Sequence, residues 1–247
     1  EVSDDIYSID GAMRVGYNWK RGPFEMIDSI GAENFAKRLE SSGREVPPLV
    51  NKAASMGSFY SLRDGELMRL SSNGSKSAVP RPEETISISD FKRKGSPIIR
   101  NPSASIWDMG DDILLVEYHT KMNAVDPLII EMLKEAVRMA EEEPWKAIVI
   151  GNDAKNFSAG ANLGLVLFAI NLSAWKEVEE FIQSGQEAYQ ALKFCSVPVV
   201  GASAGLCLGG GAEVLLHCDA IQAHSESYIG LVAVSYTHLT LPTTPYV

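Results

Sequence analysis

Residues 197–216 read VPVVGASAGLCLGGGAEVLL, and this stretch is the best guide to the fold. It is long enough to cross a membrane, and Glu213 is its only charged side chain. Pro198 and five glycines interrupt it, however, and they argue against a membrane span. We therefore expect a short buried strand, a tight loop and a buried helix, with no membrane span in the chain.

Short apolar strands alternate with helical patterns before this stretch. Strands are predicted at 104–108, 112–118 and 147–150, and Asp126 is predicted to cap an amphipathic helix. A long helix is expected before residue 197. One of its faces is traced by Trp175, Val178, Ile182, Tyr189 and Leu192. Helices between short buried strands indicate an α/β unit with a largely parallel sheet.

The first 104 residues have a different character. They carry 15 Lys and Arg against 14 Asp and Glu, whereas residues 105–247 carry 7 against 18. The pattern of residues 1–42 predicts a small all-α fragment made of short helices, one of which covers residues 32–41. Residues 43–104 contain several prolines and a run of serines, a composition that is typical of an extended linker with little local structure.

Composition excludes several classes of protein. The chain has 247 residues, 45% of them hydrophobic, and a net charge of -10, which argues against nucleic acid as a partner. Its three cysteines form no Cys-x-x-Cys pair, so we expect reduced thiols and an intracellular, cytoplasmic protein. The chain starts at Glu1 without a signal peptide, so we expect it to begin inside a longer protein or after processing.

Two glycine-bearing loops, at 157–163 and 205–213, each follow a predicted buried strand. Ligands of open α/β folds gather at such strand ends, and amides converging from two loops can form an oxyanion hole. Glu213 lies three residues after Gly210, so its carboxylate can face the same pocket as a base. The alternative, on spacing alone, is a tight strand-to-helix turn with a structural glutamate.

Other cofactor sites are not indicated. The cysteine and histidine spacings at Cys207, His217, Cys218 and His224 match no common zinc pattern. The chain also contains neither Gly-x-Gly-x-x-Gly nor a P-loop. We therefore predict no metal and no cofactor in these 247 residues.

Four motifs occur in order along the second half of the chain. They are Lys121-Met122-Asn123-Ala124, residues 156–163 (NFSAGANL), residues 198–200 (PVV), and residues 208–213 (LGGGAE) followed by Cys218-Asp219. Together they resemble the enoyl-CoA hydratase/isomerase (crotonase) family over residues 105–232. The resemblance implies an incomplete crotonase-like ββα superhelix. Separately, residues 16–28 (GYNWKRGPFEMID) resemble part of the C-terminal helical domain of 3-hydroxyacyl-CoA dehydrogenases.

The resemblance implies a role for particular residues. Ala161 and Gly210 match the positions whose amides hold the thioester oxygen, and Glu213 matches the first of two catalytic glutamates. Six further residues fall where the family binds its acyl-CoA substrate: Lys121, Ala124, Ala159, Gly160, Asn162 and Leu163.

The implied activity is hydration of trans-2-enoyl-CoA to 3-hydroxyacyl-CoA in fatty-acid β-oxidation. The parent protein would also be an NAD-dependent 3-hydroxyacyl-CoA dehydrogenase, with NAD bound by a domain absent from this chain. The resemblance further implies an oligomer or a thiolase partner for the full-length protein. Two alternatives stay open: an enoyl-CoA isomerase, and an inactive fragment that only binds acyl-CoA.

The sequence departs from the family near its end. The position of the second glutamate falls at Ala233. Residues 233–247 (AVSYTHLTLPTTPYV) resemble a peptide translated from sequencing-adapter DNA, so we expect a non-native tail and little turnover. The expected organisation is thus a dehydrogenase fragment at 1–42, a linker at 43–104, a truncated hydratase domain at 105–232 and the tail.

Overall fold

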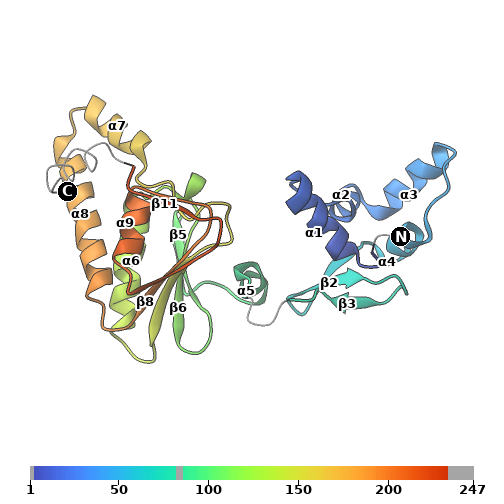
Figure 1. Cartoon of the computed structure of the whole chain (residues 1–247), viewed down its shortest axis with the longest axis horizontal. Helices are drawn as coiled ribbons and strands as arrows, with labels where there is room; N and C mark the ends of the chain where they lie inside the picture. The colour runs from blue at the N-terminus through green and yellow to red at the C-terminus, as the bar shows by residue number, and fades with distance from the viewer. Residues whose placement is uncertain (1–2, 82–85, 233–247) are drawn as a thin grey trace, which may run out of the picture. The chain divides into compact units, whose positions relative to one another are not determined.

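The computed structural model describes residues 3–81 and 86–232, which fall into two compact units, Glu1–Gly95 and Ser96–Val247 (Figure 1). The expected non-native tail at 233–247, including Ala233, lies outside the described residues. No helix in the described part of the chain is both long and apolar enough to span a membrane.

The first unit combines helices with a small antiparallel sheet. Its helices are α1 (Ile6–Tyr17), α2 (Pro23–Ile30), α3 (Ala32–Ser41), α4 (Pro48–Met56) and α5 (Ile88–Lys94). Its strands are β1 (Tyr60–Arg63), β2 (Glu66–Leu70) and β3 (Lys76–Ala78), in the order β1-β2-β3. The helices predicted within residues 1–42 are confirmed, and α3 has the predicted bounds.

Part of the predicted linker is folded, which corrects the expectation for residues 43–104. Phe59 and Leu70 are buried in one core with Ile6 of α1 and Val50 of α4. The features that suggested an extended chain have local structural roles. Pro48 occupies the first turn of α4, where its missing N–H costs nothing. The serine-rich run forms the β2–β3 turn, in which the Asn73 side chain accepts a hydrogen bond from the Ser75 amide.

The second unit is built on a six-stranded sheet of order β10-β8-β7-β6-β5-β4. The strands are β4 (Ile99–Arg100), β5 (Ala104–Asp108), β6 (Ile113–Tyr118), β7 (Ala147–Gly151), β8 (Val199–Ser203) and β10 (Ala220–Ala223). The pairs β6–β7, β7–β8 and β8–β10 are parallel, while β4, β5 and β6 pair antiparallel. A second, parallel pair joins β9 (Leu206–Leu208) to β11 (Tyr228–Gly230). The predicted α/β class is confirmed.

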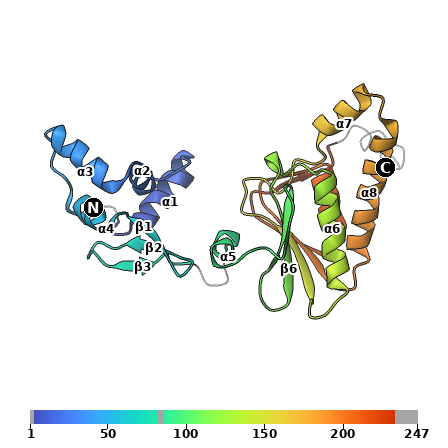
Figure 2. The same cartoon turned by 180° about the vertical axis from the view of Figure 1, so that it is seen from behind.

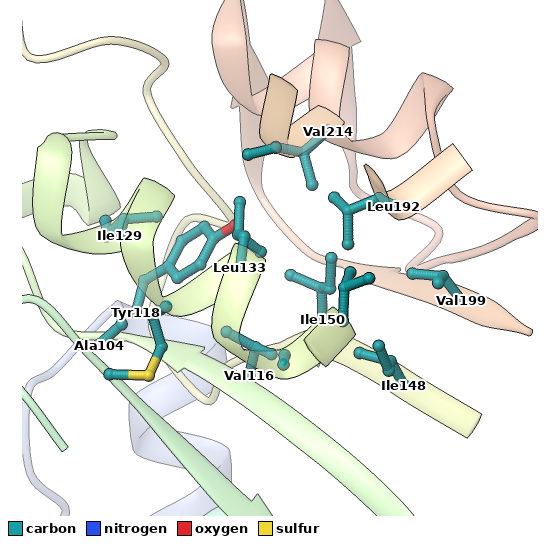
Figure 3. Close-up of a cluster of buried hydrophobic side chains, with 14 of the residues drawn as sticks. Ala104, Val116, Tyr118, Ile129, Leu133, Ile148, Ile150, Leu192, Val199 and Val214 are labelled. Atoms are coloured by element: carbon teal, nitrogen blue, oxygen red, sulfur yellow. The ribbon is translucent and has the colours of Figure 1, made fainter. Parts of the chain in front are cut away.

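Helices α6 (Pro127–Ala140), α8 (Trp175–Lys193) and α9 (Gly210–Leu216) cover one face of this sheet (Figures 1 and 2). Asp126 caps α6 as predicted, because its Oδ1 accepts a hydrogen bond from the Ile129 amide at 2.9 Å. The core contains side chains from strands and helices alike. Figure 3 shows Val116, Ile148 and Ile150 of the sheet facing Leu133, Leu192 and Val214 of the helices.

The apolar stripe predicted for α8 is correct only at its C-terminal end. Leu192 is buried, but Trp175 is 61% and Ile182 54% exposed. The neighbouring helix α7 (Leu163–Asn171) is almost wholly apolar, yet none of its residues is buried. Periodicity alone marks an apolar face and cannot say which part of it another element covers.

Candidate active site

A cavity of about 500 Å³ opens in the second unit beside α8 and α9. Its walls are one face of α8, from Phe181 to Gln190, and the segment from Gly210 to His217, which is α9 and its C-cap residue. Val125, Ile130 and Ala161 complete the side nearest α6. The cavity therefore contains three residues predicted to act together: Ala161, Gly210 and Glu213.

Ala161 is held at the cavity by two neighbouring loops. The Val125 amide donates to the Gly160 carbonyl at 2.7 Å, and the Asn162 amide donates to the Val125 carbonyl at 2.8 Å. The Ala161 amide lies between these two bonds and has no acceptor among the described residues. Gly160 has φ +90°, and a Cβ there would lie 2.7 Å from the Leu208 carbonyl oxygen. Only glycine lets the loop approach the 208–213 segment so closely.

The three consecutive glycines have three separate roles. Gly209 has φ 50° and ψ -122°, a backbone conformation that side chains disfavour. A Cβ on Gly211 would lie 2.6 Å from the Ser158 Cβ, so this position packs α9 against the other glycine loop. Gly210 is the first residue of α9, and its amide also has no acceptor in the described chain.

Gly210 also leaves space inside the cavity. A Cβ on this residue would lie 3.4 Å from the Ala161 nitrogen and 3.8 Å from Glu213 Oε2. The Ala161 nitrogen and the start of α9 at Gly210 therefore lie close together, with the Glu213 carboxylate beside them. Two unpaired backbone donors this close together are the components of an oxyanion hole, and their binding of one oxygen stays a prediction.

Glu213 is placed by the start of α9. Residues three apart share a helix face, so Glu213 faces the same cavity as Gly210. Its carboxylate makes no hydrogen bond or ion pair with any residue that the structure describes. It is therefore available to exchange a proton with a bound molecule.

Tyr189 and His217 are among the cavity residues that sequence reasoning missed. Tyr189 Oη donates a hydrogen bond to the Gly210 carbonyl at 3.3 Å, and its ring centroid lies 5.6 Å from that of His217. His217 Nδ1 lies 2.7 Å from the Glu213 carbonyl oxygen. Burial, and then the charge of Glu213, raise the pKa of Tyr189 well above its usual value. The sequence placed Tyr189 on a core stripe, because spacing does not show where that stripe meets α9.

Comparison with known proteins decides the family. Residues 111–239 match the model of the enoyl-CoA hydratase/isomerase family. The chain belongs to this family.

The chain is also similar to two bacterial proteins, one over nearly its whole length and one over about half of it. The chain is 38% identical over 234 residues to a probable 3-hydroxyacyl-CoA dehydrogenase of Bacillus subtilis, covering 94% of this chain and 29% of that relative. A crotonyl-CoA hydratase of Syntrophomonas wolfei is 32% identical over 120 residues, which are 48% of this chain and 45% of that protein. The chain thus spans less than a third of the Bacillus relative and about half of the hydratase.

Solved structures show the same fold. An enoyl-CoA hydratase from Geobacillus kaustophilus matches with a TM-score of 0.50 and 22% sequence identity, over 56% of this chain and 52% of that one. The match covers about half of each chain.

The residues predicted to bind the acyl-CoA substrate lie outside the lining of this cavity. These six residues, all in the described part of the chain, are Lys121, Ala124, Ala159, Gly160, Asn162 and Leu163. Their two segments nevertheless lie side by side, because the Ala159 amide donates to the Met122 carbonyl at 3.1 Å. Asn162 caps α7, and Leu163 is 67% exposed. Their role in substrate binding stays a prediction.

The described residues provide neither a reactive thiol nor a group of metal ligands for this site. Burial raises the pKa of both Cys207 and Cys218 to about 12, so these thiols stay protonated at neutral pH. Within residues 3–81 and 86–232, no three His, Cys, Asp or Glu side chains are grouped to hold a metal ion.

Proposed function

We propose that the cavity binds the thioester of a trans-2-enoyl-CoA and serves its hydration to 3-hydroxyacyl-CoA in fatty-acid β-oxidation. The observation that carries this proposal is that the unpaired Ala161 and Gly210 amides lie close together beside Glu213. A thioester oxygen at that point would receive two N–H donors. These donors would stabilise the negative charge that develops on the oxygen when C3 is attacked.

The chemistry needs one water molecule and a group that moves protons. The hydroxyl of water forms the new bond to C3, the C2–C3 double bond opens toward the thioester, and C2 receives a proton. Glu213 is placed to take the proton of the attacking water. The family position of a second carboxylate falls at Ala233, so we expect hydration by this chain to be slow.

A second candidate is enoyl-CoA isomerisation. Glu213 is the one carboxylate lining the cavity among the described residues. A single carboxylate suffices to move a proton between C2 and C4 of the acyl chain, since the same group takes and returns it. The family model includes both activities in its name.

We further propose that residues 1–95 belong to the helical domain of a 3-hydroxyacyl-CoA dehydrogenase. Support comes from the Bacillus relative, whose similarity covers 94% of this chain. NAD would serve that dehydrogenase reaction in a longer protein. These 247 residues contain no Gly-x-Gly-x-x-Gly loop, so NAD would be bound by another part of that longer protein. A cytoplasmic location fits the three free cysteines, and a thiolase partner or oligomer remains part of the proposal for the longer protein.

Crotonyl-CoA hydration, followed by loss of the enoyl absorbance, tests the proposal. The Ala233→Glu variant is assayed beside the parent chain and is expected to be faster. In the Ala233→Glu background, Glu213→Gln is expected to lower the rate by about 10²–10⁴-fold, because the proton carrier is lost while its shape is kept. Glu179→Gln on the exposed side of α8 is the matched control, with no expected change.

Three other results would contradict the proposed hydration or the role of Glu213 in it. Interconversion of 3-enoyl-CoA and 2-enoyl-CoA without hydration would favour the isomerase. Thioester binding without either reaction would leave an acyl-CoA-binding fragment. Hydration that is unchanged in Glu213→Gln would remove Glu213 from the mechanism.

A further inference from the structure

We propose that the Tyr189 hydroxyl is a third hydrogen-bond donor to the ligand's thioester oxygen, beside the amides of Ala161 and Gly210. This inference rests on the proposed thioester site and assigns a catalytic residue to it. Tyr189 comes from α8, so the oxygen would be held by three separate parts of the chain.

The geometry places Tyr189 Oη and the Ala161 nitrogen on either side of the space in front of Gly210. A Cβ on Gly210 would lie 3.3 Å from Tyr189 Oη and 3.4 Å from the Ala161 nitrogen. Such a point needs to move by only a few tenths of an ångström to lie within about 3 Å of both donors. The Glu213 carboxylate, at 3.8 Å, lies close enough to act on atoms bonded to this oxygen's carbon.

The hydroxyl is free to turn toward a ligand. Its hydrogen bond to the Gly210 carbonyl is 3.3 Å long, beyond the range of about 2.5–3.0 Å that is usual between two oxygens. Exchanging this weak bond for one to a charged or strongly polarised oxygen is favourable, because hydrogen bonds to charged groups are stronger.

The surroundings keep Tyr189 in place as a donor. Its ring packs near His217, whose Nδ1 is hydrogen-bonded to the α9 backbone. Burial and the charge of Glu213 raise its pKa, so the phenol retains its proton at neutral pH. A merely structural Tyr189 would instead tie α8 to α9 through the Gly210 carbonyl. The two roles differ in what happens to a bound thioester.

The experiment measures polarisation of the bound thioester and needs no turnover. The probe is para-dimethylaminocinnamoyl-CoA, whose absorption moves to longer wavelength when its carbonyl is polarised. We expect the parent chain to bind it with a red shift. Tyr189→Phe keeps the ring, and we expect a smaller red shift with affinity reduced roughly threefold to tenfold. Tyr228→Phe, at a tyrosine that is 68% exposed and does not line the cavity, is expected to match the parent.

A second substitution has the opposite expected sign. Fluorotyrosine at position 189 keeps the shape and is a stronger donor, so the red shift is expected to increase. An unchanged red shift and affinity in both variants, with only the melting temperature altered, would overturn the inference and leave a structural tie. A parent chain that binds the probe without any red shift, or does not bind it, would instead refute the thioester site itself.

Discussion

The two units treat their central polar groups in opposite ways. In the first unit, the Asp10 carboxylate is fully buried and accepts three hydrogen bonds: from the Phe24 amide at 2.8 Å, the Glu25 amide at 3.2 Å and Tyr60 Oη at 2.7 Å. In the second unit, the Ala161 and Gly210 amides and the Glu213 carboxylate have no partner among the described residues. The first cluster is complete, whereas the second is open to a cavity.

This contrast separates residues that stabilise from residues that react. A buried polar group without a partner costs free energy, whereas unpaired groups that face an open cavity are free to bind a ligand. By the same reasoning, residues 22–25 (GPFE) of the first unit have a structural role, because each polar group among them has a partner within the unit. A Cβ on Gly22 would clash with Asp10, Pro23 begins α2, and Glu25 accepts the Gly22 amide at 2.8 Å and pairs with Arg14 at 2.6 Å.

The largest expected effect comes from removing the complete cluster. Asp10→Ala would leave two backbone amides without their acceptor, and we expect the first unit to lose about 3–5 kcal/mol of unfolding free energy. Hydrogen exchange read by mass spectrometry can follow the two units separately. Probe binding by the second unit is expected to stay unchanged, because all residues lining its cavity lie in Ser96–Val247.

The matched control is Asp4→Ala, at an exposed aspartate two residues before α1. A loss below about 1 kcal/mol in Asp10→Ala would show that the buried carboxylate is not a centre of stability, since orphaned amides should cost more.

Placing a methyl group among Ala161, Gly210 and Glu213 should lower activity and leave the stability of the fold unchanged. A Cβ added by Gly210→Ala would occupy the point between the Ala161 nitrogen and Tyr189 Oη. We expect hydration in the Ala233→Glu background to fall by about 10²–10³-fold, the usual effect of disabling an oxyanion hole. The melting temperature should not fall appreciably, because alanine favours a helix more than glycine does.

Gly11→Ala in α1 provides the control, since nothing lies within 4 Å of the added Cβ. It should leave hydration unchanged. Retention of at least half of the activity in Gly210→Ala would exclude this point as the place of the thioester oxygen.

The sequence predicted the parts of the molecule that depend on local chemistry. The Asp126 cap, the strands around it and the two glycine loops are local features that the sequence indicates directly. The resemblance to the hydratase/isomerase family added Ala161 to the same site as Gly210 and Glu213. The core of the first unit could not be predicted in this way, because Phe59 and Leu70 share it with residues that are distant in sequence, such as Ile6 and Phe24. Tyr189 was missed for a similar reason, since its position depends on how α8 packs against α9.

The smallest expected effect is the pH dependence of the first unit. Burial raises the pKa of Asp10 above 3.8, assisted by the nearby charge of Glu25 and opposed by the hydrogen bonds from Tyr60 and the two amides. The folded unit therefore binds this proton more tightly than the unfolded chain does. The contribution of Asp10 to stability is full below pH 3.8 and declines as pH rises through its folded pKa, by at most about 1.4 kcal/mol per pH unit.

Other carboxylates of the unit, including Asp5 and Asp90, have lowered pKa values and act in the opposite direction. Subtracting the stability of Asp10→Asn from that of the parent isolates the residue, because the asparagine does not titrate. We expect this difference to decrease as pH rises across the window and to stay constant above it, in denaturant titrations monitored by hydrogen exchange of the first unit. A difference that increases with pH would mean that the three hydrogen bonds favour the carboxylate more than burial disfavours it. In that case the ionised Asp10 would itself be the stabilising form.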